Sequence, residues 1–207
     1  LVLMGQMHQV VEFSDDYLFY CERYGSDVDY LSYYNLMATV KLQLELYQEA
    51  IEMLDKMAQL AQKLNNHPYY LMAIGNKLHI YDTLNEFELG YRHFKQYESL
   101  FHEPDIQGMR LAYFAFKING LAILAGLNKY DEMQQPLNWL EHVSLEGFHR
   151  EEMFYLYYKE VYALHVNHDM SAFARLKIMI EQAEQLFDHT LLIKLLEDVL
   201  ALSTKFD

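Results

Sequence analysis

The sequence predicts an all-α protein built from about five stacked helix pairs. Turn-forming residues are scarce, with 8 Gly and 3 Pro among 207 residues. That is too few for an all-β fold with a turn about every ten residues. Apolar residues recur every three or four positions, and one motif returns at intervals near forty residues. A hydrophobic content of 52% allows a sizeable core, so the chain is not a disordered tail.

The repeat is anchored on an aromatic or apolar residue. The clearest anchor is Tyr47, in Leu-Tyr-Gln-Glu-Ala-Ile at 46–51, and further anchors fall at Met7, Phe87, Tyr130 and Met170. Successive anchors are 40 or 43 residues apart. At an offset of 43, six positions match: Asn76 with Asn119, Leu78 with Leu121, Ile80 with Ile123, Leu84 with Leu127, Asn85 with Asn128 and Phe87 with Tyr130. Such a period indicates an array in which each unit covers its neighbour's apolar face.

Each half of a repeat is predicted to be a helix. Steps of three and four residues place one apolar stripe after Tyr47, and a similar stripe surrounds Phe87. Breaker segments such as Gly25-Ser26-Asp27 and Asn65-Asn66-His67-Pro68 separate the stripes. A partial first unit ends near Tyr24, and the expected helices span about 28–46, 48–65, 68–84, 86–102, 105–127, 130–145, 149–167, 171–187 and 190–203.

The breakers also predict how the chain is organised. One repeat domain covers 1–207, with units at about 1–25, 26–66, 67–103, 104–147 and 148–188 and a terminal helix at 189–204. The chain starts at Leu1 without an initiator Met, and we therefore expect it to be a fragment of a longer protein.

The charge and the cysteine content argue against several classes of ligand and of structural site. The formal net charge is −14, which argues against nucleic acid or an anionic membrane as the main ligand, because both need a basic surface. One cysteine, Cys21, excludes an intrachain disulfide and a cysteine-based zinc site, and fits a reducing compartment. No stretch approaches the roughly 20 apolar residues that cross a bilayer. A cytoplasmic protein is expected.

At its anchors the chain resembles a tetratricopeptide repeat (TPR) protein. Tyr47, Ala50, Leu54 and Ala58 fall where that family has a turn aromatic, a small, a bulky and another small residue, and Phe87, Gly90 and Phe94 repeat the first three. Met133, Met170 and Phe173 depart from the pattern, and the period exceeds the 34 residues typical of the family. Long-helix variants occur in bacterial peptide-sensing regulators and in sensory arrays upstream of GGDEF diguanylate cyclases. The resemblance implies a right-handed α-solenoid with a C-terminal capping helix.

The resemblance also implies a groove lined by the first helix of each repeat. The residues projected onto this groove, and taken as candidate peptide- or protein-binding residues, are Asn35, Thr39, Asn76, His79, Asp82, Asn119, Tyr155, Tyr158 and Tyr162, with Lys159 and His165 beside the last three. Asparagine can donate and accept hydrogen bonds at once, which suits the backbone of an extended peptide. The three asparagines could instead cap or bridge neighbouring helices.

Tyrosine is in excess, at 18 of 207 residues. Tyrosines provide large contact areas at a low entropy cost, so Tyr155, Tyr158 and Tyr162 could form a binding face. They could equally pack between repeats with their hydroxyls at the rim. Both interpretations remain open at the level of sequence.

Motifs for catalysis or for metal binding are not found. The sequence has no glycine-rich phosphate loop, HExxH, GxSxG or kinase signature. His165 and His168 are three residues apart beside Asp169, but a further ligand at fixed spacing is missing. Cys21 lies on a helical stripe in an acidic neighbourhood, which favours a buried structural thiol over a nucleophile. We expect no cofactor, no metal and no enzymatic activity.

The last predicted helix is unusually apolar, with leucines at 191, 192, 195, 196, 200 and 202. A terminal repeat that faces water needs a polar outer side. This helix therefore either packs back on the array or covers a further repeat, a second subunit or an effector domain. The leading expectation is a sensory-regulatory module that binds a peptide or protein segment in its groove. A scaffold or dimerisation domain acting through its terminal helices is the alternative.

Overall fold

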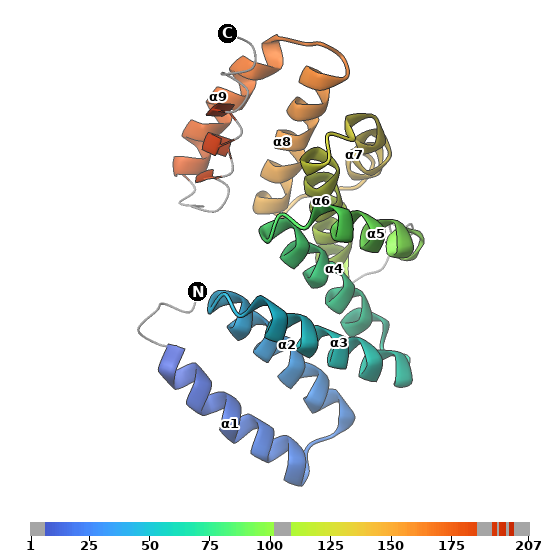
Figure 1. Cartoon of the computed structure of the whole chain (residues 1–207), viewed down its shortest axis with the longest axis vertical. Helices are drawn as coiled ribbons and strands as arrows, with labels where there is room; N and C mark the ends of the chain where they lie inside the picture. The colour runs from blue at the N-terminus through green and yellow to red at the C-terminus, as the bar shows by residue number, and fades with distance from the viewer. Residues whose placement is uncertain (1–6, 102–108, 186–191, 194, 198, 201–207) are drawn as a thin grey trace. The chain divides into compact units, whose positions relative to one another are not determined.

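The computed structural model describes residues 7–101, 109–185, and 192, 193, 195–197, 199 and 200 (Figure 1). Within these residues all regular elements are helices, which confirms the predicted all-α class. The α-helices are α1 (Met7–Tyr24), α2 (Asp27–Gln43), α3 (Tyr47–Lys63), α4 (His67–Thr83), α5 (Phe87–Tyr97), α6 (Arg110–Gly126), α7 (Gln134–Glu141), α8 (His149–His165) and α9 (Ser171–Gln185). Two short 3-10 helices are η2 (Glu98–Phe101) and η3 (Tyr130–Met133).

Helices α2 to α5 follow a strict register. They begin at Asp27, Tyr47, His67 and Phe87, which are twenty residues apart. Helices α2, α3 and α4 each contain 17 residues, and α6 and α8 have the same length. Two successive helix–turn units therefore produce the period of forty residues that the sequence shows.

A common turn produces this register. Glu45, Asn65, Asn85, Asn128 and His168 all have positive φ, between 52° and 59°. In the turns after α3 and α4, the N–H groups of Asn66 and Glu86 donate to the carbonyls of Ala61 and Tyr81, both at 2.8 Å. This is the Schellman motif, in which one left-handed residue ends a helix and satisfies its last carbonyls. Three residues separate α2 from α3, α3 from α4 and α4 from α5, and each of these turns reverses the chain.

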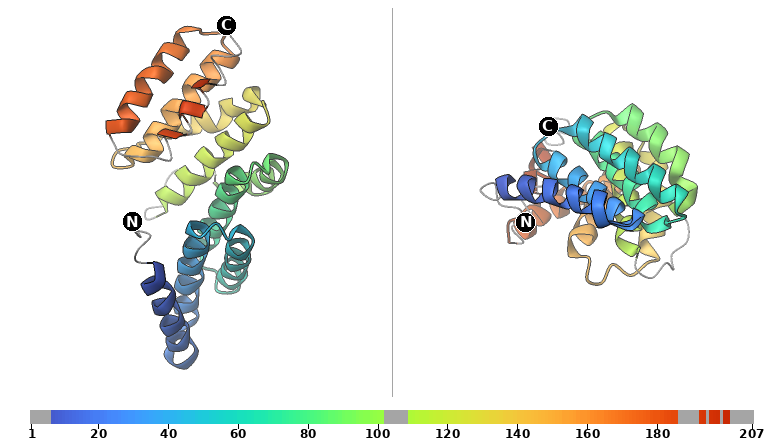
Figure 2. Two further views of the ribbon diagram at one scale, coloured as in Figure 1. Left: turned by 60° about the vertical axis from the view of Figure 1, so that its left-hand side comes forward. Right: turned by 90° about the horizontal axis from the view of Figure 1, so that it is seen from below.

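The chain divides into two compact units, Leu1–Phe116 and Lys117–Asp207, and the division falls within α6. In the first unit each helix from α1 to α5 packs against the next one, as Figure 2 also shows. Helix α2 contacts α4 as well, and a hydrogen bond of 2.7 Å joins Ser32 Oγ to Tyr69 Oη. The core is made of side chains from α2, α3 and α4 that include Leu31, Ala50, Leu54, Met57, Ala61 and Ile80.

Aromatic rings join α5, η2 and the start of α6 in the first unit. Phe101 and Phe116 are stacked with ring centroids 3.8 Å apart, and Phe94 lies 5.2 Å from Phe116. All three side chains are fully buried. Burial of each large ring removes much apolar surface from water and stabilises this junction.

In the second unit, α8 packs against α7, η3 and α9. The helix predicted at 130–145 is interrupted, because the structure has η3 over Tyr130–Met133 and α7 only over Gln134–Glu141. Pro136 explains the difference: it has no N–H for the carbonyl of residue 132 and disfavours α-conformation at the preceding residue. The start of the helix predicted at 105–127 lies partly outside the described residues, which resume before Arg110.

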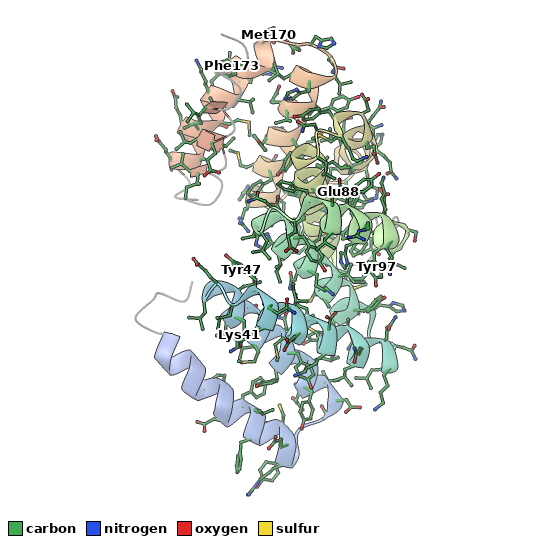
Figure 3. All side chains as sticks on the ribbon, in the orientation of Figure 1. Lys41, Tyr47, Glu88, Tyr97, Met170 and Phe173 are labelled. Atoms are coloured by element: carbon green, nitrogen blue, oxygen red, sulfur yellow. The ribbon has the colours of Figure 1, made fainter. Side chains whose placement is uncertain are left out.

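The last anchor, Met170, is exposed, whereas Tyr47, Phe87 and Tyr130 are half-buried. Figure 3 labels Met170 and Phe173 at the start of α9. Met170 is 56% exposed and Phe173 is half-buried, whereas Ala172 between them is fully buried. Five residues separate α8 from α9, against three in the turns from α2 to α5, and the N–H of Asp169 donates to the carbonyl of Ala163. The buried position at the start of α9 is 172, one residue before the position that the forty-residue period predicts. Of the residues that the structure describes, none belongs to a helix both long and apolar enough to cross a membrane.

Candidate binding site between α7 and α8

A cavity of about 180 Å³ lies between α7 and α8 in the second unit. Its lining residues on α7 are Gln134, Leu137, Asn138 and Glu141, at the spacing of one helix face. Leu137 is buried and the three polar residues are exposed. Helix α7 therefore provides one apolar residue to the floor and three polar residues to the rim.

Helix α8 provides the opposite wall. Tyr155, Lys159, Tyr162 and Ala163 line the cavity at a spacing of four, three and one residues, and Asn167 follows the end of the helix. Tyr155 is buried, Tyr162 and Ala163 are half-buried, and Lys159 and Asn167 are exposed. The cavity thus combines an apolar floor with amides and an ion pair at its rim. We call it the α7–α8 cavity.

The ion pair connects the two helices. Lys159 Nζ lies 2.9 Å from Glu141 Oε1 and 3.3 Å from Tyr155 Oη, and both partners of the pair are about half exposed, at 48% and 55%. The hydrogen bond from Lys159 lowers the pKa of the Glu141 carboxyl. The hydrogen bond to Glu141 is the main cause that raises the pKa of the Lys159 ammonium, and the bond to Tyr155 adds to it. Both groups are therefore charged at neutral pH, and they compensate each other.

Two of the predicted binding residues, Tyr155 and Tyr162, line the α7–α8 cavity together with Lys159. Tyr158 does not: only 1% of it is exposed, and its ring packs against Tyr157 with centroids 4.8 Å apart. Its ring belongs to the core of the second unit. One face of α8 therefore lines the cavity, and another face packs in the core.

The other predicted residues lie elsewhere. Asn35 and Thr39 are on α2, and Thr39 Oγ1 donates to the carbonyl of Asn35 at 3.0 Å. Asn76, His79 and Asp82 are on α4, and Asn119 is on α6. None of these six residues lines the α7–α8 cavity. A role for them in ligand binding stays a prediction.

Sequence reasoning missed the α7 side of the cavity. Gln134, Asn138 and Glu141 lie on the second helix of a pair, whereas the projected groove uses the first helices. Their spacing of four and three residues was the available signal, because it places three polar side chains on one helical face. What the sequence does not show is how far α7 is rotated toward α8.

Of the three residues considered for metal or thiol chemistry, His165 packs against an aromatic ring and Cys21 is buried. The ring of His165 stacks on Tyr130 with centroids 3.9 Å apart and planes 2° apart. Cys21 is buried, and burial raises the pKa of its thiol, with Asp29 adding to the effect. Within the described ranges no three His, Cys, Asp or Glu side chains gather as a metal-binding group.

Comparison with known proteins gives no assignment. No protein-family model matches the chain, and neither a curated protein nor a solved structure matches it. The functional argument therefore depends on the helices and the cavity themselves.

Proposed function

We propose that this chain is a non-enzymatic interaction module of the TPR type, a right-handed superhelical stack, that binds a peptide or protein segment. The observation that carries the proposal is the α7–α8 cavity, with its apolar floor and polar rim. Protein interfaces have the same arrangement, with a buried apolar centre surrounded by groups that can form hydrogen bonds. The twenty-residue register of α2–α5 supports a repeat architecture.

A peptide suits the cavity better than a rigid small molecule. The side chains of Gln134, Asn138 and Asn167 each offer a carbonyl and an NH₂ group, which match the alternating donors and acceptors of an extended backbone. Tyr155 and Tyr162 provide contact area with few rotatable bonds to immobilise.

We further propose that the module is sensory or regulatory and belongs to a bacterial-type cytoplasmic signalling protein. The resemblance to peptide-sensing regulators and GGDEF-associated arrays supports this context. A ligand that contacts both α7 and α8 would favour one packing of the two helices over others, because it binds one arrangement better. That preference is the physical basis for regulating an attached effector.

Selection from a displayed peptide library tests the proposal. Purified protein should enrich binders, and Ala163→Trp should abolish their binding because the indole fills the cavity. Ala174→Trp on the exposed face of α9 is the matched control and should bind as the wild type does. Failure to enrich any peptide would contradict the proposed function. Peptides that bind Ala163→Trp and wild type equally would show that the cavity is not the site.

A scaffold that self-associates is the second candidate. Ile193, Leu196 and Leu200 are exposed and spaced by three and four residues, so they can form one apolar stripe. If this stripe mediates a dimer, light scattering should show a mass that rises with concentration, and Leu196→Glu should lower it to that of the monomer. A monomer at all concentrations would contradict this candidate.

A further inference from the structure

The chemistry of the α7–α8 cavity restricts its ligand. We infer that the cavity accepts one uncharged apolar side chain, of leucine to phenylalanine size, from a peptide whose flanking residues are basic. This inference rests on the proposed function and specifies its partner. It combines three properties of the molecule: the volume of the cavity, the compensated charges at its rim and the net charge of the chain.

The volume sets the size of the anchor side chain. An apolar protein cavity of roughly 150 Å³ holds a benzene molecule. The α7–α8 cavity measures about 180 Å³, so it accommodates the side chain of Leu, Met or Phe. An Ala side chain leaves most of this space empty.

The lining excludes a charged anchor. Leu137, Ala163 and the two tyrosine rings surround the inner part of the cavity. The two charged residues of its lining, Glu141 and Lys159, already bind each other at 2.9 Å. A ligand charge placed inside would lose its hydration without a counter-charge and would be strongly disfavoured. An apolar side chain has no such cost and gains from leaving water.

Charge outside the cavity determines the flanking residues. The chain has a formal net charge of −14, and its field attracts a cationic ligand and repels an anionic one. At the rim, the Glu141 side chain is 55% exposed and bonds Lys159 through Oε1. A carboxylate has room for several donors, so a ligand lysine or arginine can share it with Lys159.

The same charge argues against other occupants. A second copy of this chain would bring another net charge of −14 to the site, and an acidic peptide would meet the same repulsion. Both would also place carboxylates near Glu141. A basic peptide segment is therefore the occupant that fits the rim and the field together.

A panel of labelled nonapeptides tests the inference. The central residue is Leu, Phe, Ala or Glu, and the other positions alternate Lys with Gly or Glu with Gly. Fluorescence anisotropy with the full chain should show that Leu and Phe in the lysine frame bind about tenfold or more tighter than Ala, from the additional buried carbons. The peptide with a central Glu, and every peptide in the glutamate frame, should bind at least as weakly as Ala in the lysine frame.

Charge variants test how the rim residues contribute to peptide binding. Glu141→Gln should weaken the Leu-centred lysine peptide several-fold, and Lys159→Met should strengthen it, because the two changes alter the local charge in opposite directions. Glu184→Gln on the exposed face of α9 is the control for Glu141→Gln and should have little effect. Circular dichroism checks that each variant keeps the helical content of the wild type.

The outcomes distinguish this inference from the proposed function. Peptides that bind at the cavity without preference for the central residue, or that prefer the glutamate frame, overturn the inference and leave the proposed function intact. Equal effects of Glu141→Gln and Glu184→Gln overturn the role assigned to the rim. If library selection yields no peptide either, both the inference and the proposed function are wrong.

Discussion

Gly25 lies between α1 and α2, where the backbone leaves no room for a side chain. It follows the last residue of α1, and a Cβ there would lie 2.5 Å from Cys21 Cα and 2.7 Å from the Cys21 carbonyl oxygen. Because both are backbone atoms, they cannot move independently of α1. We expect Gly25→Ala to lower the free energy of unfolding by about 1–3 kcal/mol, measured by urea denaturation.

Gly75 is the matched control for this substitution. A Cβ at this position in α4 would lie 3.9 Å from the carbonyl oxygen of Ala112, which is an ordinary contact distance. In a helix interior alanine is more favourable than glycine by about 1 kcal/mol. Gly75→Ala should therefore stabilise the protein, whereas equal effects of the two changes would contradict the steric account of Gly25.

At the residue scale, two candidate binding residues, Tyr155 and Tyr162, line the cavity, whereas Tyr158 between them is buried. Their role in binding stays a prediction. Periodicity of tyrosines predicts a stripe, and a stripe alone does not tell the side that packs from the side that binds. Glu141 was missed because its importance comes from its contact with Lys159, which depends on helix packing.

At the element scale, substitution of a left-handed turn residue should change the free energy of unfolding. Glu45 has a φ of 59°, which costs a side chain with a Cβ about 1 kcal/mol or more. Glycine adopts this conformation without that cost. We expect Glu45→Gly to stabilise the protein by roughly 0.5–1 kcal/mol in urea denaturation.

Glu52 provides the same chemical change in a different backbone context. It is exposed in the interior of α3, where glycine is less favourable than other residues by up to about 1 kcal/mol. Glu52→Gly should therefore destabilise the protein. If both glutamates give effects of the same sign, the turn conformation does not control the result.

The start of α9 should make stability depend on acidity. Asp169 Oδ1 accepts hydrogen bonds from the N–H and Oγ of Ser171, and Oδ2 accepts one from Arg175. These bonds, led by those from the Ser171 and Arg175 side chains, lower the pKa of Asp169 from 3.8 to about 2. Because the folded pKa is below the unfolded one, its stabilising contribution is complete above about pH 4. It is lost as the pH falls from there toward 2.

Comparison with Asp169→Asn isolates this contribution, since asparagine is also a good helix cap but carries no charge. Thermal unfolding should show a higher Tm for the wild type at pH 5–7. The difference should shrink between pH 4 and pH 2. A difference that stays constant over this range would show that the ionised carboxylate is not what stabilises the start of α9.

At the scale of the whole molecule, the forty-residue period was predictable because it is set locally, by helix length and turn chemistry. The breaker at Asn65 predicts a turn, and Asn85 falls between the helices expected at 68–84 and 86–102. Both residues have the left-handed conformation that commonly ends a helix. The α7–α8 cavity was not predictable as a whole. Pro136 shortens α7, and the buried position at the start of α9 is 172 instead of 173, so the second unit departs from a simple copy of the first.

The net charge of the molecule should govern how fast a basic peptide binds. With −14 charges on the chain, attraction acts at long range and is screened by salt. Raising NaCl from about 50 to 500 mM, over which the Debye length falls about threefold, should slow association of the Leu-centred lysine peptide about tenfold. Stopped-flow fluorescence measures this rate. The dissociation rate should change little, whereas an association rate independent of salt would contradict the charge argument.

Amide chemical-shift mapping with the Leu-centred lysine peptide compares the cavity with the terminal helices in one experiment. In the ¹⁵N-labelled chain we predict that the largest saturable shifts fall on Gln134–Glu141 and on Tyr155–Asn167, and that Ala163→Trp removes them. Shifts concentrated on Met7–Tyr24 or on residues 192–200, with none around the cavity, would contradict the account.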